Sequence, residues 1–331
     1  MKCINKLAII SAVVILGTNL CSCSSRDFSI AYKRNFDNST IRIESIDESQ
    51  RAESYTVDLC VSDSNKQKLC DSVNIENIGS LGLFNLTDCE TVYSYNMFER
   101  RDMASLTKVM TALVTLEAIE EGKVSLSDRI VVKESAIKDI PTDASSCDLV
   151  PGDTITLNQA LFALMVASAC DVANIIAEHV SGSVEDFVDL MNQRAHEIGA
   201  TNTHFSNTHG LTAENHYSTV YDQYLIFNKA ASYPKFKEII NMHKYLSTYT
   251  GPEGEEKNLE LYTTNLYFRG NAKMPSNVTV LGGKTGSTNA AGYCLILYVT
   301  DAQGNDYIAV ILGSERRTNL YEEMTNMLNE L

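Results

Sequence analysis

Residues 104–113 read ASLTKVMTAL, and they place a serine three positions before a lysine. The apolar residues that recur at the i, i+3, i+4, i+7 spacing of one helix face are Leu106, Val109, Met110 and Leu113. Because three residues make almost one helical turn, Ser105 and Lys108 project from the same face, where an amine can activate a hydroxyl as a nucleophile. Taken alone, the pattern is better explained by an exposed serine followed by a solvated lysine, since S-x-x-K occurs by chance in many helices.

The composition is that of an ordinary globular protein. The chain has 331 residues, of which 44% are hydrophobic and 21% are charged, which suits one large domain or two small ones. Its net charge of −15 argues against a nucleic-acid partner, because binding to a phosphate backbone depends on lysine and arginine.

The first residues have the layout of a secretory signal. Two lysines precede an apolar run at 7–16, which is too short to span a bilayer comfortably. Residues 20–23 read LCSC and resemble the cleavage box of bacterial lipoproteins, although Cys21 stands where a small or β-branched residue is more common. We therefore expect a signal peptide at 1–22, followed by a lipid-anchored Cys23 or by plain secretion, and an exported protein in either case.

The rest of the chain divides into a tether and a folded body. Residues 23–56 are polar and charged, with no regular apolar pattern, and this predicts a tether between the membrane and the body. Residues 57–331 are predicted to form a single domain.

The cysteines carry information because disulfides persist outside the cytoplasm. Those that remain after the predicted signal and Cys23 are Cys60, Cys70, Cys89, Cys147, Cys170 and Cys294. They contain no C-x-x-C pair, which argues against a zinc site, and no metal is expected. Six cysteines allow many pairings, but Cys60 and Cys70 flank a polar turn that a local disulfide could close.

Strand-like runs lie at both ends of the body, and helices lie between them. The runs with strand character are 81–86, 91–95, 278–281, 293–299 and 307–312. The middle is mainly helical, beginning with a helix from Ser105 to about Glu121 that ends at Gly122, and a helix from about Asn319 closes the chain. We predict an α/β fold with an antiparallel sheet of about five strands, flanked by helices and interrupted by an inserted all-helical subdomain.

Three short motifs occur in a fixed order along this framework. They are Ser105-x-x-Lys108, Ser168-Ala169-Cys170 and Lys284-Thr285-Gly286. Motifs of this kind together mark penicillin-binding proteins and β-lactamases. The chain resembles the low-molecular-weight penicillin-binding proteins that act as serine D-alanyl-D-alanine carboxypeptidases. The likeness extends from about Ser80 to the C-terminus and includes the stretches 104–113, 207–211, 216–219, 283–288 and 291–294.

The resemblance implies a β-lactamase/transpeptidase-like fold and a reaction through an acyl-enzyme. Ser105 would attack the penultimate D-Ala carbonyl of a peptidoglycan stem peptide, Lys108 would be the general base, and Ser168 would pass a proton to the leaving amine. The residues that would contact the substrate are Lys284, Thr285, Gly286, Ser287 and Cys170. The backbone N–H groups of Ser105 and Ser287 would form the oxyanion hole.

The same resemblance implies partners and a location. β-Lactam antibiotics would acylate Ser105, no cofactor is implied, and the protein would act on the extracytoplasmic face of a bacterial membrane. The neighbouring class A β-lactamases carry a Glu-x-x-Leu-Asn element that activates water, and none lies between Ser168 and Lys284.

The second motif departs from the family pattern, which reads Ser-x-Asn where this chain has Cys170. An asparagine offers an amide acceptor and an amide donor, and a thiol is a weak substitute for both. Three explanations stay open: the cysteine is a tolerated variant, it forms a disulfide with Cys147, or the site is impaired. The last would make the chain a non-catalytic wall-binding or regulatory homologue.

Overall fold

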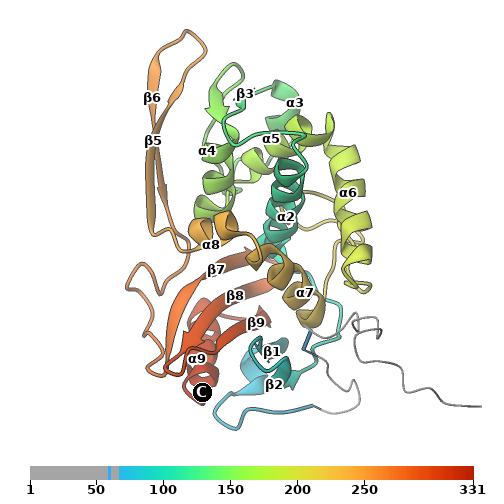
Figure 1. Ribbon diagram of the computed structural model, residues 1–331, viewed down its shortest axis with the longest axis vertical. Helices are drawn as coiled ribbons and strands as arrows, with labels where there is room; N and C mark the ends of the chain where they lie inside the picture. Colours follow the sequence, from blue (N-terminus) through green and yellow to red (C-terminus); the bar gives the residue numbers. More distant parts are fainter. Residues whose placement is uncertain (1–58, 61–66) are drawn as a thin grey trace, which may run out of the picture. The chain divides into compact units, whose positions relative to one another are not determined.

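One antiparallel sheet is assembled from both ends of the described chain (Figure 1). Its strands are β1 (Ser80–Asn85), β2 (Glu90–Tyr95), β7 (Val278–Thr288), β8 (Gly292–Asp301) and β9 (Asp306–Ser314). They lie in the order β2-β1-β9-β8-β7, so the last strand of the sequence pairs with the first and β7 forms an edge. The predicted sheet of five antiparallel strands is confirmed, and β7 continues through the Lys284-Thr285-Gly286 motif.

The computed structural model describes residues 59–60 and 67–331, which lie in one structural unit spanning residues 54–331. The predicted signal peptide at 1–22, the tether at 23–56 and Cys23 lie outside the described residues, so these remain predictions. Within the described ranges, every helix is too short or too polar to cross a membrane.

The sheet is buried on both faces, which explains the nearly continuous apolar runs of its central strands. Along β8, Cys294, Ile296 and Tyr298 pack into the core shared with the inserted helices. The alternate residues Leu295, Leu297 and Val299 pack into a second core against α9 (Arg317–Leu328), which covers the opposite face.

The segment inserted between β2 and β7 carries most of the helices. They are α2 (Thr107–Glu120), α3 (Glu134–Ile137), α4 (Leu157–Phe162), α5 (Cys170–Ser181), α6 (Val184–Glu197), α7 (Val220–Ala231) and α8 (Pro234–Ile240), with the 3-10 turn η3 (Ala104–Leu106) and the π-helical turn η4 (Ala163–Ala167). The predicted helix from Ser105 ends one residue before Glu121, and Gly122 adopts the left-handed conformation expected at a helix end.

The insert is not all-helical, because it also contains a second antiparallel sheet in the order β3-β4-β5-β6. Its strands are β3 (Arg129–Val131), β4 (Thr154–Thr156), β5 (Lys244–Thr250) and β6 (Glu256–Tyr262). β3 and β4 have three residues each, and β5 and β6 are mainly polar, with an apolar alternation limited to Leu259 and Leu261 of β6, which is too short to predict a strand.

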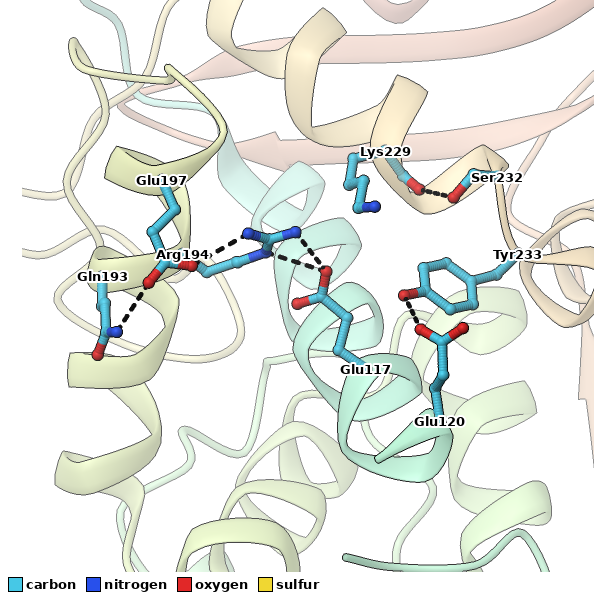
Figure 2. Close-up of polar contacts among 8 residues, drawn as sticks. All are labelled: Glu117, Glu120, Gln193, Arg194, Glu197, Lys229, Ser232 and Tyr233. Carbon is cyan, nitrogen blue, oxygen red and sulfur yellow. Dashed lines mark hydrogen bonds and ion pairs between the residues drawn. The ribbon is translucent and has the colours of Figure 1, made fainter. Parts of the chain in front are cut away.

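Helix α2 runs through the centre of the insert and is buried on all sides except at its last turn. There Glu117 forms an ion pair with Arg194 of α6, with 2.8 Å between the charged atoms (Figure 2). In the same turn, the Tyr233 hydroxyl donates to the Glu120 carboxylate at 2.8 Å. These contacts fix the C-terminal end of α2, which lies opposite to Ser105.

Neither of the two possible disulfides, Cys60–Cys70 and Cys147–Cys170, is present in this structure, in which all six cysteines of the described ranges are free thiols. Cys60 and Cys70 pack into different apolar cores, and the Cys60 thiol donates to the Asn85 carbonyl. The Cys170 thiol is turned toward Lys108.

Candidate active site

The serine turn precedes α2 and has an unusual backbone. Ser105 lies in η3, and Ala104 before it has a φ of +47°, a left-handed conformation that costs an alanine free energy. The Ala104 carbonyl accepts a hydrogen bond from the Thr107 hydroxyl, which in turn accepts from His216 Nε2, both at 2.8 Å. Since Nδ1 of His216 accepts from the Ser206 backbone N–H, Nε2 carries the proton, and this chain of bonds stabilises the turn.

Two glycines allow other segments to approach the serine turn closely. A side chain at Gly210, whose φ is +88°, would overlap the Ala104 carbonyl. A side chain at Gly286 on β7 would lie 3.0 Å from the backbone nitrogen of Ser105. The Ser105 N–H therefore lies beside the strand that carries Ser287, as the predicted oxyanion hole requires.

Lys108 is fully buried and makes three polar contacts through its Nζ. The Nζ lies 3.0 Å from Ser105 Oγ, 2.6 Å from the His209 carbonyl oxygen and 3.4 Å from Cys170 Sγ. Burial lowers the pKa of Lys108, and the neighbouring Cys170 and Asp171 oppose this shift only in part. A lowered pKa makes the neutral amine, which can accept the Ser105 proton, available at lower pH.

Lys284 and Ser168 form the second half of the network. Lys284 Nζ donates to Ser168 Oγ at 2.9 Å and to the Thr285 carbonyl at 2.7 Å. Burial and the nearby Lys108 hold the pKa of Lys284 well below its usual value. Two buried amines in one site repel each other when both are charged, so the charge on Lys108 adds to the effect of burial on the pKa of Lys284.

Ser168 and Cys170 lie at a break between two helices. The π-helical turn η4 ends at Ser168, whose φ of 61° is left-handed, and α5 then begins at Cys170. The α5 turn is held by the preceding loop, since Cys170 N donates to the Ser145 carbonyl at 2.7 Å and the Asp171 carboxylate accepts from Ser146 Oγ at 3.0 Å. Cys170 is therefore fixed by backbone contacts, with its thiol on Lys108.

Two cavities that share part of their lining lie beside Ser105. The smaller, of about 160 Å³, is lined by Ser168, Thr285, Thr264 and Arg269, and the hydroxyls of Thr264 and Thr285 are 2.6 Å apart. The larger, of about 860 Å³, is bounded by residues 141–145, 210–212 and 287–293, with Cys170, Glu315 and Arg317. Gly286 and Ser287 line the smaller cavity as well, so every residue predicted to contact substrate except Lys284 lines one of the two cavities.

Sequence reasoning missed several of these residues. Arg269 and Thr264 lie in the irregular segment between β6 and β7, and Arg317 is the first residue of α9. None belongs to a periodic pattern or to a quoted motif, so only their positions in the fold connect them with Ser105. The His209 carbonyl was also missed, because its role uses a backbone oxygen that any residue could supply.

Two histidines, His209 and His216, order the loop between α6 and α7. His209 Nδ1 accepts from the Leu211 backbone N–H, and burial lowers the pKa of His209 to about 3. Burial also lowers the pKa of His216 to about 4. Both rings are therefore neutral near pH 7, and neither contacts the Ser105 hydroxyl in the described part of the chain.

Comparison with known proteins agrees with this geometry. The D-alanyl-D-alanine carboxypeptidase family model matches residues 80–316. D-alanyl-D-alanine carboxypeptidase DacF of Bacillus subtilis is 34% identical over 243 residues, which cover 72% of this chain and 58% of DacF. The corresponding DacC of Escherichia coli is 32% identical over 236 residues, covering 70% of this chain and 56% of DacC. The chain thus spans less than two thirds of the length of these two relatives.

A solved structure shows the same fold. The crystal structure of the Streptomyces K15 DD-transpeptidase superposes with a TM-score of 0.70 and 26% identity, covering 76% of this chain and 96% of that one. The resemblance inferred from the three motifs and the β-lactamase/transpeptidase-like fold are both confirmed.

Proposed function

The chain belongs to the D-alanyl-D-alanine carboxypeptidase family, and on this premise we propose that it removes the terminal D-Ala of peptidoglycan stem peptides through an acyl-enzyme on Ser105. The observation that carries the proposal is the contact between the buried Lys108 amine and the Ser105 hydroxyl, 3.0 Å apart, in a turn that opens into two cavities. A serine needs such a base within hydrogen-bond reach to become nucleophilic.

The reaction follows from these positions. Neutral Lys108 takes the Ser105 proton as Oγ attacks the penultimate D-Ala carbonyl, and the resulting oxyanion faces the N–H groups of Ser105 and Ser287. As the C–N bond breaks, Ser168 gives its proton to the leaving D-Ala amine and regains one from Lys284, to which it is hydrogen-bonded. Water then attacks the ester carbonyl and gives a proton to Ser168, which passes its own to Lys284, while Lys108 returns its proton to Ser105 Oγ as the C–O bond breaks; the shortened peptide and the free serine are released.

The smaller cavity suits the terminal carboxylate of the substrate. Arg269 supplies a cation there, and Thr264 and Thr285 supply hydroxyl donors. Lys284 donates hydrogen bonds to Ser168 and to the Thr285 carbonyl. It therefore attracts a carboxylate in this cavity mainly through its charge. We expect penicillins, which carry a carboxylate on the carbon attached to the lactam nitrogen, to place it in the same cavity and to acylate Ser105.

Cys170 in place of asparagine is compatible with this function. Its thiol occupies the position of an acceptor for Lys108, and a sulfur can accept an N–H bond weakly. Solved variants of the Streptomyces K15 enzyme change a serine and, two positions further along, a cysteine, which is the spacing of Ser168 and Cys170 here. The alternative is an impaired homologue with a wall-binding or regulatory role.

We further propose that the chain acts on the extracytoplasmic face of the membrane, held there by a lipid on Cys23. The support is the signal-like composition of residues 1–22 and the cysteine that follows. Metabolic labelling with a radioactive fatty acid should mark the wild type, and a Cys23→Ala variant should lose the label and move to the medium. A variant that stays membrane-bound and unlabelled would show that another element anchors the chain.

Fluorescent penicillin tests the enzymatic proposal. The purified wild type should acquire label on the peptide that contains Ser105 and should release D-Ala from a synthetic pentapeptide. Ser105→Ala should do neither, whereas Ser125→Ala, which removes an exposed serine outside both cavities, should behave as wild type. A folded wild type that is not labelled and releases no D-Ala would overturn the proposal in favour of the impaired homologue.

A further inference from the structure

The two cavities at Ser105 differ in what they offer to a peptide. The smaller one holds Arg269 and two threonine hydroxyls and is matched to a carboxylate that ends the chain. If the terminal D-Ala fills it, as the proposed function requires, the rest of the stem peptide must leave Ser105 through the larger cavity. That cavity, of about 860 Å³, has room for more than the penultimate D-Ala.

Charged side chains of both signs line the larger cavity. Asp143 comes from the loop after α3, Glu315 follows β9, and Arg317 opens α9. All three are exposed, and within the described ranges none forms an ion pair or a side-chain hydrogen bond. The Arg317 guanidinium has one polar contact, with the face of the Tyr293 ring 5.4 Å away, which leaves its N–H donors free.

On this path the side chain of the residue before D-Ala-D-Ala would enter the larger cavity and meet these charges. The loop at 141–145 and the 287–293 turn line that cavity together with Ser105 and Cys170. A side chain that carries an ammonium would meet the carboxylates of Asp143 and Glu315. A side chain that also carries a carboxylate would meet Arg317, which lies at the boundary of the two cavities and lines both.

We propose that the larger cavity selects stem peptides whose third residue is a diamino dicarboxylic acid of the diaminopimelate class with its side-chain amine free. Asp143 and Glu315 bind the ammonium, and Arg317 binds the side-chain carboxylate. A lysine at the same place satisfies only the acidic residues, and an uncharged residue satisfies none of the three. Because cross-linking converts the amine into an uncharged amide, the preference also directs the enzyme to uncross-linked stems. This proposal rests on the proposed carboxypeptidase function.

The test compares three pentapeptides that differ only at the third residue: meso-diaminopimelate, L-lysine and L-norleucine. The expected order of kcat/KM for D-Ala release is diaminopimelate, lysine, norleucine. Each lost contact should lower kcat/KM by up to about fivefold, the contribution of an exposed ion pair, and the steps should shrink as salt is raised.

Charge-removing variants assign each contact. In Arg317→Gln the ratio of kcat/KM between the diaminopimelate and lysine peptides should fall toward one. In the double variant Asp143→Asn, Glu315→Gln the ratio of kcat/KM between the lysine and norleucine peptides should fall toward one. Arg316→Gln and Asp148→Asn are matched controls, because both remove exposed charges of the same two segments that do not line the cavity, and they should keep the wild-type ratios.

Penicillin labelling of Ser105 separates the two proposals. If all three peptides release D-Ala with the same kcat/KM and labelling is normal, the specificity proposal is overturned and the enzymatic function stands. Ratios that change equally in the control variants would overturn it as well. If neither labelling nor D-Ala release occurs, the enzymatic function itself fails, and the specificity proposal fails with it.

Discussion

Replacement of Cys170 addresses the one position at which this chain departs from the family motif. In Cys170→Ala the buried Lys108 amine loses the acceptor 3.4 Å away and keeps only Ser105 Oγ and the His209 carbonyl. A buried donor left without its partner costs about 1–3 kcal/mol, and a thiol is a weak acceptor, so the low end of the range applies. About 1.4 kcal/mol lost from the positioning of Lys108 would slow acylation roughly tenfold.

The contact between Cys170 and Lys108 also determines in which direction the pH dependence of acylation should move. The neighbouring Cys170 raises the pKa of Lys108 against the larger effect of burial. Its removal should therefore lower that pKa further, and the rising limb of acylation against pH should move to lower pH in Cys170→Ala. Cys170→Asn supplies an amide oxygen as acceptor, so its acylation rate should equal or exceed that of wild type. The rising limb of its acylation against pH should lie closer to that of wild type than the limb of Cys170→Ala does.

The assay is the second-order rate of acylation by fluorescent penicillin, measured from pH 5 to 10. Cys60→Ala is the matched control, since it removes another buried thiol, one that lines neither cavity. It should reproduce any general loss of stability without the change in rate or pH profile. Acylation of Cys170→Ala at the wild-type rate with an unshifted profile would refute the argument that the thiol positions Lys108.

Three further predictions concern the framework of the site. Gly210→Ala should lower the free energy of unfolding by about 3 kcal/mol or more and abolish penicillin labelling, because the new methyl group would overlap the Ala104 carbonyl. Gly122 is also left-handed but lies in open space, so Gly122→Ala should lower the free energy of unfolding by only about 1–2 kcal/mol in a urea titration. The pKa of His216 is about 4 in the folded protein and its ordinary value is 6.5, so the unfolded state binds the proton first as pH falls. Between pH 7 and 5 the free energy of unfolding of wild type should therefore fall by about 1–2 kcal/mol more than that of His216→Gln. Equal losses in the two proteins would contradict this. Arg194→Leu should lower the free energy of unfolding by about 1–2 kcal/mol, since it leaves a half-buried carboxylate of α2 unpaired, and an unchanged melting temperature would exclude that role.

The parts of the site that sequence analysis predicted are those that depend on local geometry. Ser105 and Lys108 are one helical turn apart, so their contact follows from the helix alone. The five strands of the main sheet were predicted because they are buried and therefore apolar. The second sheet was not, because β5 and β6 are exposed and polar, and their pairing is a consequence of position in the fold.

Packing between distant segments decided the rest. The bond between Lys284 and Ser168 joins residues 116 positions apart, and the lowered pKa of both lysines follows from their shared burial, which no sequence pattern encodes. The two possible disulfides are absent for the same reason, because a cysteine count gives no information on where a thiol points. Sequence by itself determined the family and placed Ser105 and Lys108 on one helix face, within reach of each other. Only the tertiary structure decided that Cys170 faces Lys108 and that Arg269 and Arg317 line the cavities, because such contacts are made by side chains that folding brings together from segments far apart in the chain.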